Sequence, residues 1–91
     1  MINDADTREQ VRISMLRYLA RAAEHGLGQT VLWTFVRTEG FREVTRPDIG
    51  VELQYLSDKC LVVTLAKDIS PELAHWRITA TGRDWLAKNL E

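Results

Sequence analysis

The sequence contains only one cysteine, Cys60, and only two histidines, and none of its apolar runs is longer than a few residues. A single cysteine excludes an internal disulfide and is typical of the reducing cytoplasm, where we expect this protein. The apolar runs are far shorter than the roughly 20 residues that cross a bilayer, so the sequence predicts no membrane-spanning helix. The polar, acidic first residues are unlike a signal or transit peptide.

An excess of either charge is also missing. The chain has 12 lysine and arginine residues against 13 aspartate and glutamate residues, a formal net charge of −1. Proteins dedicated to nucleic acids usually carry a basic excess, so the composition by itself does not indicate one. The 91 residues, 45% of them apolar and 27% charged, fit one globular domain. We expect a single domain over residues 1–91, with 1–6 as a disordered lead-in.

Residues that carry catalysis or bind metals are sparse and scattered. His25 and His75 fall at a predicted helix end and on a predicted strand, and neither has a cysteine, histidine or carboxylate at ligand spacing. There is no glycine-rich phosphate loop, and Ser14, Ser57 and Ser70 lack triad-like neighbours. We therefore expect no enzymatic activity, metal, cofactor or small-molecule ligand.

The most informative stretch begins at Thr45. Asp48 follows it by three residues with Pro47 between them, which is a helix start signal. A residue before proline avoids the α region, so the cap is either Thr45 or Arg46. Apolar residues then recur at spacings of four, three and four, which places them on one side of a helix: Ile49, Leu53, Leu56 and Cys60. This pattern predicts a helix over 45–59.

Side chains off this apolar line are expected on the other sides of the helix, Glu52 among them. Cys60 is expected in the core rather than as a reactive thiol, since it continues the apolar line. The next residues, 61–66, are predicted to form a strand that follows the helix without a turn residue.

The first predicted helix covers about Thr7 to His25 and ends at Gly26. Its apolar residues share a face: Val11, Met15, Tyr18, Leu19 and Ala22. Ser14 is expected in the polar wedge opposite this face. The broad apolar side either packs all round within the domain or partly contacts a second subunit.

The second predicted helix covers about Gln29 to Glu39, with four apolar residues inward: Val31, Leu32, Phe35 and Val36. Gly40 followed by Phe41 is the pattern of a helix that ends in a left-handed residue. Trp33 points away from the apolar line, and we expect it to cover the first helix or the sheet.

The C-terminal part predicts a hairpin and a last helix. A strand over 75–79 follows the loop 67–74, and a helix opens after Thr79 with Trp85, Leu86 and Leu90 inward. The order is helix, helix, helix, strand, wing loop, strand, helix. The predicted class is α+β, mostly α, in the winged helix-turn-helix arrangement.

Two motifs carry a family resemblance. Thr45-x-x-x-Ile49-x-x-x-Leu53-x-x-Leu56-x-x-x-Cys60-Leu61-Val62 resembles the recognition helix and following strand of bacterial winged helix-turn-helix transcription regulators. Ile78-Thr79-x-x-Gly82-x-x-x-Leu86 resembles the junction between the wing and the last helix in that family. The family usually has glycine where this chain has Cys60. The layout is also similar to small winged-helix proteins of Mu-like prophages.

The resemblance implies a DNA-binding transcriptional regulator that reads a major groove of double-stranded DNA with helix 45–59. It also implies a homodimer through the first and last helices. The candidate DNA-binding residues lie on that helix and on the wing: Thr45, Arg46, Val51, Gln54, Tyr55, Lys67 and Arg77.

Acidic residues argue against this function. Asp48, Glu52 and Asp58 lie on the helix, and Asp68 and Glu72 lie at the wing tip, where they weaken attraction to phosphates. The connection between the second and third helices is also longer than the tight turn of the motif. The alternative is a winged-helix protein–protein interaction module without direct DNA binding.

Overall fold

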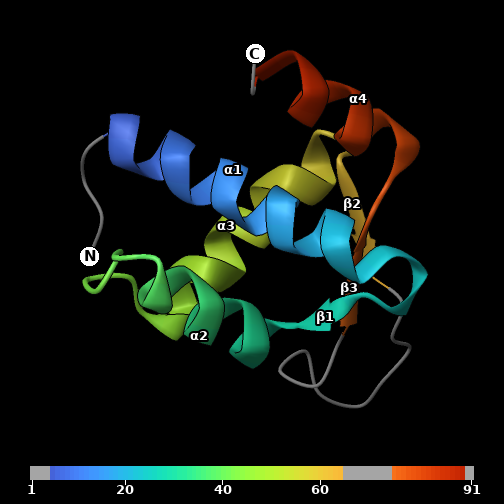
Figure 1. The fold of residues 1–91 in the computed structure, drawn as a ribbon. Helices are drawn as coiled ribbons and strands as arrows, with labels where there is room; N and C mark the ends of the chain where they lie inside the picture. The colour runs from blue at the N-terminus through green and yellow to red at the C-terminus, as the bar shows by residue number, and fades with distance from the viewer. Residues whose placement is uncertain (1–4, 65–74, 90–91) are drawn as a thin grey trace.

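The computed structural model describes residues 5–64 and 75–89. In these ranges the chain forms, in order, α1 (Ala5–Ala22), the 3-10 turn η1 (Ala23–His25), β1 (Leu27–Gly28), α2 (Gln29–Thr38), α3 (Arg46–Asp58), β2 (Val62–Thr64), β3 (His75–Ile78) and α4 (Ala80–Asn89) (Figure 1). The predicted mostly helical α+β order, three helices followed by a hairpin and a helix, is confirmed. Helix α1 begins at Ala5, so the last two residues of the expected lead-in 1–6 are helical. Residues 1–4 lie outside the described ranges.

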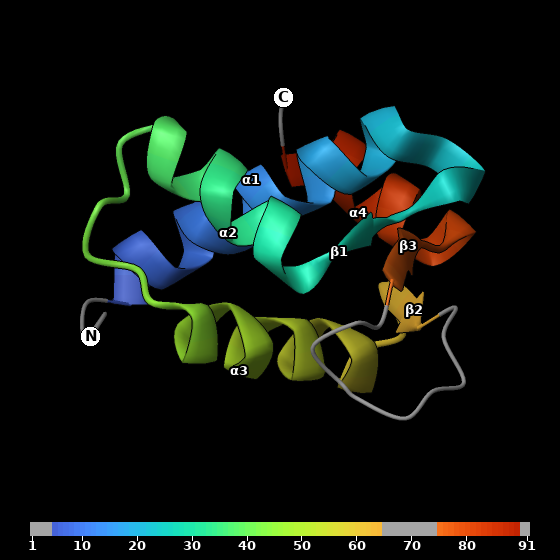
Figure 2. The ribbon, with the colours of Figure 1, turned by 90° about the horizontal axis from the view of Figure 1, so that it is seen from below.

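Helix α1 is the centre of the fold, because it contacts α2, α3, α4 and β3. Figures 1 and 2 show α2 at one end of the molecule and the strands with α4 at the other, while α3 runs between the two ends and leads into β2. This all-round packing explains why Ser14, expected in a polar wedge, is buried instead. Contact of the partly buried residues of α1 with a second subunit stays a prediction.

The described strands form a three-stranded antiparallel sheet in the order β1-β3-β2. In the hairpin, Val62 is opposite Ile78. Leu27 of β1 is opposite Trp76 on the other side of β3. The sequence predicts only the hairpin, since the two-residue strand β1 is too short to show a period. Strand β1 ties the end of α1 to the hairpin.

The apolar core draws on all four helices and on the hairpin. Its buried residues are Val11, Met15, Leu16, Leu19, Leu32, Val36, Val44, Ile49, Leu53, Leu56, Leu61, Val62, Ile78 and Leu86. The predicted apolar line of α3 is confirmed from Ile49 to Leu56. The inward placement of Val31 and Phe35 on α2 is wrong: 43% and 37% of their surfaces are exposed. They lie on a side of α2 that the core does not cover.

Helices α2 and α3 end in the same backbone motif. Gly40 has a φ of 119°, and its N–H donates to the Arg37 carbonyl at 3.0 Å, which confirms the predicted left-handed end of α2. At the end of α3, Cys60 has a φ of 63°. The Cys60 N–H donates to the Ser57 carbonyl and the Leu61 N–H to the Leu56 carbonyl, both at 2.9 Å.

Cys60 is exposed, so its expected place in the core is wrong. The left-handed turn rotates its side chain off the apolar line and passes the chain inward at Leu61. The position has the conformation that glycine adopts without cost.

Replacing Cys60 with glycine is expected to raise the free energy of unfolding by about 0.5–1 kcal/mol. A non-glycine residue in the left-handed region costs about 1–2 kcal/mol, and the greater freedom of glycine in the unfolded chain removes part of the gain. Urea unfolding under reducing conditions measures the change. Cys60→Ser keeps the Cβ atom and is expected to match the wild type; equal stability of both variants would contradict the prediction.

Thr79 joins the start of α4 to the end of α3. Its hydroxyl donates to the Cys60 carbonyl at 2.8 Å and accepts from the Gly82 N–H at 2.9 Å. Its backbone N–H donates to the Leu61 carbonyl at 3.0 Å. Gly82 is buried against this junction, where a Cβ atom would overlap the Leu61 carbonyl oxygen. Thr79 and Gly82 of the junction motif are thus both required by the close contact between α4 and the end of α3.

Candidate nucleic-acid interface

The first turn of α3 is closed by a capping box. The Asp48 N–H donates to the Thr45 hydroxyl at 3.2 Å, and the Thr45 N–H donates to the Asp48 carboxylate at 3.0 Å. Thr45 is extended, with φ −98° and ψ 167°, so Thr45 and not Arg46 is the cap. Both side chains are therefore used within the helix start, although the Thr45 O–H can still donate to a ligand.

One side of α3 faces away from α1 and α2, and no described helix or strand covers it (Figure 2). The exposed side chains of this helix include four of the candidate residues: Arg46, Val51, Gln54 and Tyr55. Val51 is 57% exposed and Tyr55 is 38% exposed, although both are apolar or aromatic. The structure thus brings these candidates onto one helix surface.

Glu52 lies on the opposite, buried side of α3 and is only 3% exposed. One carboxylate oxygen accepts from Arg8 Nε at 3.1 Å, and the other accepts from Arg12 Nε. The expectation that Glu52 faces outward is therefore wrong. Because the two arginines come from α1, this buried ion cluster fastens α3 to α1, and it removes one acid from the outer side of α3.

The remaining candidates on α3 already have intramolecular contacts. The Gln54 amide donates to the Asp58 carboxylate at 3.0 Å. The Arg12 guanidinium lies 3.8 Å from the centre of the Tyr55 ring, and Lys59 Nζ lies 5.7 Å from it. Tyr55 is therefore held in place at the edge of the surface, and Gln54 has to exchange one partner for another when it binds a ligand.

Of the two candidate residues on the wing, Arg77 lies in the part of the chain that the structure describes. Arg77 is exposed on β3, where it is paired with Val63 of β2. Lys67 lies outside the described residues, as do Asp68 and Glu72. The structure therefore places Arg77 on the hairpin, away from the first turn of α3.

A hydrogen bond joins the first turn of α2 to the first turn of α3. The Gln29 amide donates to the Arg46 carbonyl at 3.1 Å. Its Nε2 atom is 3.0 Å from the place where a Cβ atom on Gly50 would stand. A hollow of about 240 Å³ opens here, lined by Gln29, Thr30, Arg46 and Pro47. The exposed side of α3 thus continues onto the first turn of α2.

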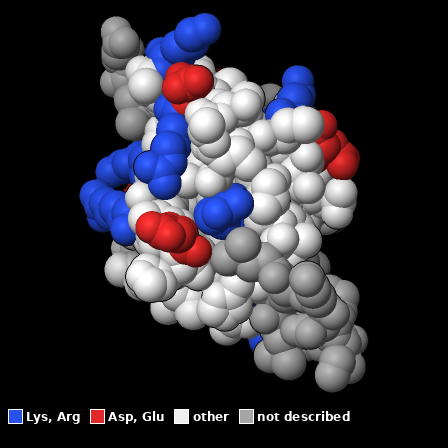
Figure 3. All heavy atoms as spheres, turned by 90° about the vertical axis from the view of Figure 1, so that its right-hand side faces the viewer, with Lys and Arg blue, Asp and Glu red and all other residues white. Residues whose placement is uncertain are grey.

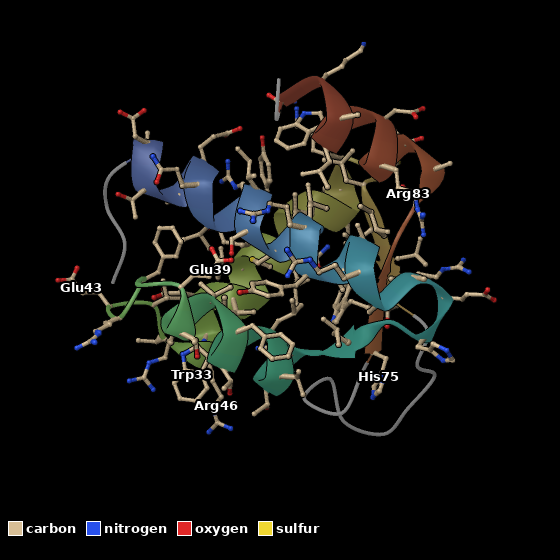
Figure 4. All side chains as sticks on the ribbon, viewed as in Figure 1. Trp33, Glu39, Glu43, Arg46, His75 and Arg83 are labelled. Carbon is tan, nitrogen blue, oxygen red and sulfur yellow. The ribbon has the colours of Figure 1, made fainter. Side chains whose placement is uncertain are left out.

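Trp33 sits between α2 and the connection 39–45, not on α1 or the sheet as expected. Its indole N–H donates to the Val44 carbonyl at 2.8 Å. The guanidinium carbons of Arg37 and Arg46 lie 4.9 Å and 5.7 Å from the centre of its ring. Figure 4 shows Trp33 and Arg46 pointing the same way, at the lower edge of the molecule. Arg37 was not among the predicted site residues, although its spacing of four from Trp33 on one helix places the two side chains together.

The acids of this region point elsewhere. In Figure 4, Glu43 lies at the far end of the connection, and Glu39 lies between α2 and α1. A hydrogen bond with Glu39 raises the pKa of Tyr18 above its usual value near 10. The Tyr18 ring also stacks on Phe35, with ring centres 4.9 Å apart. The basic groups around Trp33 are thus separated from Glu39 and Glu43.

The face that carries η1 and α4 is different. Figure 3 shows lysine and arginine side chains there with aspartate and glutamate side chains set among them. Arg83 is exposed on α4, far from Arg46 in Figure 4. Arg83 can therefore serve as a control residue, because it carries the same charge as Arg46 but lies on a different face of the molecule.

The chain matches no protein-family model, and no curated protein is similar enough to count as a match. Among residues 5–64 and 75–89, no helix is long and apolar enough to cross a membrane. The same ranges contain no group of three or more histidine, cysteine, aspartate or glutamate side chains that could hold a metal ion.

Proposed function

We propose that this chain is a winged-helix DNA-binding protein that lays α3 in the major groove and acts as a transcriptional regulator rather than an enzyme. The observation that carries the proposal is the uncovered side of α3. It presents Arg46, Val51 and Gln54, while Glu52 is drawn into the interior. The resemblance of the α3 and α4 motifs to winged helix-turn-helix regulators supports the same function.

The exposed side chains have the chemistry that base edges require. An arginine such as Arg46 binds guanine O6 and N7 with two hydrogen bonds, and the Gln54 amide suits adenine. Val51 can contact a thymine methyl group. The Thr45 hydroxyl, which accepts from Asp48, keeps its proton for a phosphate oxygen. Arg77 on β3 would contact phosphates from the hairpin, and Lys67 would do the same.

The charge balance predicts a modest affinity. Arg8 and Arg12 together compensate the charge of Glu52, so its carboxylate does not face a phosphate. Asp48 and Asp58 stay on α3 as charges, although the first is used in the cap and the second binds Gln54. Binding should therefore depend on a few arginines and fall with salt.

The test is binding to a random-sequence duplex at about 50 mM and about 200 mM salt. Arg46→Ala is expected to weaken binding and to reduce the slope of log affinity against log salt by about 1. Its unfolding free energy should stay within about 0.5 kcal/mol of the wild type, since the residue is exposed and its guanidinium carbon lies 5.7 Å from the centre of the Trp33 ring, a weak contact. Arg83→Ala on α4 is the matched control and should behave as the wild type.

Two results would reject the proposal. The first is the absence of wild-type binding even at low salt. The second is an equal effect of Arg46→Ala and Arg83→Ala, because general charge and not the surface of α3 would then control binding.

The second candidate function is a protein–protein interaction module. It is favoured by exposed apolar side chains on α2, Val31 and Phe35, the latter stacked on Tyr18 of α1. The predicted homodimer through the first and last helices belongs to the same question. The mass in solution separates the cases: a dimer that binds no DNA favours the interaction module, whereas a dimer that binds DNA predicts a palindromic site.

A further inference from the structure

We infer that the concavity between α2 and the connection 39–45 is a second phosphate-binding site, which holds the backbone of the same duplex that α3 reads. The inference rests on the proposed function. The concavity has a volume of about 310 Å³ and is lined by Thr34, Arg37, Thr38 and Arg42. Its two charged lining groups are guanidinium groups, which suit phosphate oxygens.

The two arginines stand on fixed backbone. Arg37 is in the last turn of α2, and its guanidinium lies over the Trp33 ring, which leaves its N–H edge available for an anion. Arg42 belongs to the connection, where Val44 is buried and its carbonyl accepts from the Trp33 indole. The Val44 N–H in turn donates to the Phe41 carbonyl at 3.2 Å. The unusual length of this connection thus gives an anchored segment that presents a cation.

The two threonines add adjustable polar groups. Each hydroxyl donates to the backbone one turn earlier, Thr34 to the Thr30 carbonyl at 3.0 Å and Thr38 to the Thr34 carbonyl at 2.8 Å. A hydroxyl can rotate, so either proton can be redirected to a phosphate oxygen. Of the two acids of this region, Glu39 hydrogen-bonds Tyr18, and Glu43 points away from Trp33 in Figure 4, although it lines a neighbouring hollow together with Arg42.

The site is close enough to α3 to serve the same duplex. The guanidinium carbons of Arg37 and Arg46 lie 4.9 Å and 5.7 Å from one ring centre, so they are at most about 11 Å apart, which is within the roughly 12 Å width of a major groove. With Arg46 at base edges, Arg37 and Arg42 are placed to reach the phosphates that border the groove.

The experiment compares Arg37→Gln/Arg42→Gln with Arg83→Gln on a labelled random-sequence duplex, by fluorescence anisotropy at about 50 mM and about 200 mM salt. The quantity compared is the ratio of the affinity at about 50 mM salt to the affinity at about 200 mM salt. Each lost phosphate contact should make this ratio about threefold smaller, so the ratio for the double variant should be about tenfold smaller than for the wild type. Arg83→Gln should match the wild type. Wild-type behaviour of the double variant, with intact DNA binding, would overturn this inference and leave the proposed function standing.

A second measurement separates duplex phosphate from free phosphate. The amide NMR signals of Thr34 and Thr38 are followed while duplex or inorganic phosphate is added. We expect micromolar duplex to shift them in the wild type and not in the double variant, and inorganic phosphate to act only at many millimolar. Tight binding of inorganic phosphate without any response to the duplex would overturn the inference. No DNA binding by the wild type in either assay would reject the proposed function as well.

Discussion

Gly82→Ala is expected to lower the free energy of unfolding by more than about 3 kcal/mol. The new Cβ atom would overlap the Leu61 carbonyl oxygen and stand 2.8 Å from Ile78 Cγ1. The carbonyl cannot move away freely, because it accepts from the Thr79 N–H at 3.0 Å. The helix therefore has to shift off the junction that Thr79 makes with Cys60. Urea unfolding measures the loss.

Gly50→Ala is the matched control, since it adds the same methyl group to a helical glycine. There the nearest atom is Nε2 of Gln29, at 3.0 Å, which is the end of a flexible side chain. Alanine gains about 1 kcal/mol of helix propensity and costs at most the Gln29 hydrogen bond to Arg46, about 1 kcal/mol. A change no larger for Gly82→Ala than for Gly50→Ala would contradict the close packing at Gly82.

Glu52→Ala is expected to cost about 3–5 kcal/mol, because it removes one partner of a buried ion cluster. Arg12, whose side chain is 14% exposed, would lose its close carboxylate partner and keep only the looser contact to Glu9 at 3.8 Å. Arg8 loses its 3.1 Å contact to the same group. Thermal or urea unfolding of the variant checks the loss.

Glu9→Ala is the control for this variant. Glu9 also pairs with Arg12, at 3.8 Å, but its side chain is 47% exposed. An exposed pair of this kind contributes about 0–1 kcal/mol. Equal costs for the two variants would show that Glu52 does not hold α3 on α1 as the contacts indicate.

The ends of the helices could be predicted because their signals are local. Thr45 and Asp48 close a capping box within one turn, so the start of α3 follows from neighbouring residues. Gly40 ends α2 for the same reason. Cys60 occupies an equivalent position, but its left-handed turn could not be inferred from the apolar period, which pointed to the core instead.

The outer residues of the candidate site also followed from the helix period, whereas their surroundings did not. Arg46, Val51 and Gln54 are on the exposed side because the buried line fixes the rotation of α3. Glu52 borders that line, and its burial depends on Arg8 and Arg12, which are 44 and 40 positions away in the chain. The approach of Arg46 to the Trp33 ring likewise depends on how the connection 39–45 folds back, whereas Arg37 reaches the same ring from four positions along the same helix.

The sequence by itself determined the order of the helices and the hairpin, the start signal of α3 and the apolar line of that helix from Ile49 to Leu56, and the structure then chose Thr45 as the cap. These depend on contacts within a turn or two, which the residue pattern contains. Only the tertiary structure decided that Glu52 is inside, that Val31 and Phe35 are outside, and that β1 joins the sheet. The physical reason is that the burial of a side chain depends on which distant element packs over it. The periodicity of apolar residues along one helix does not specify that element.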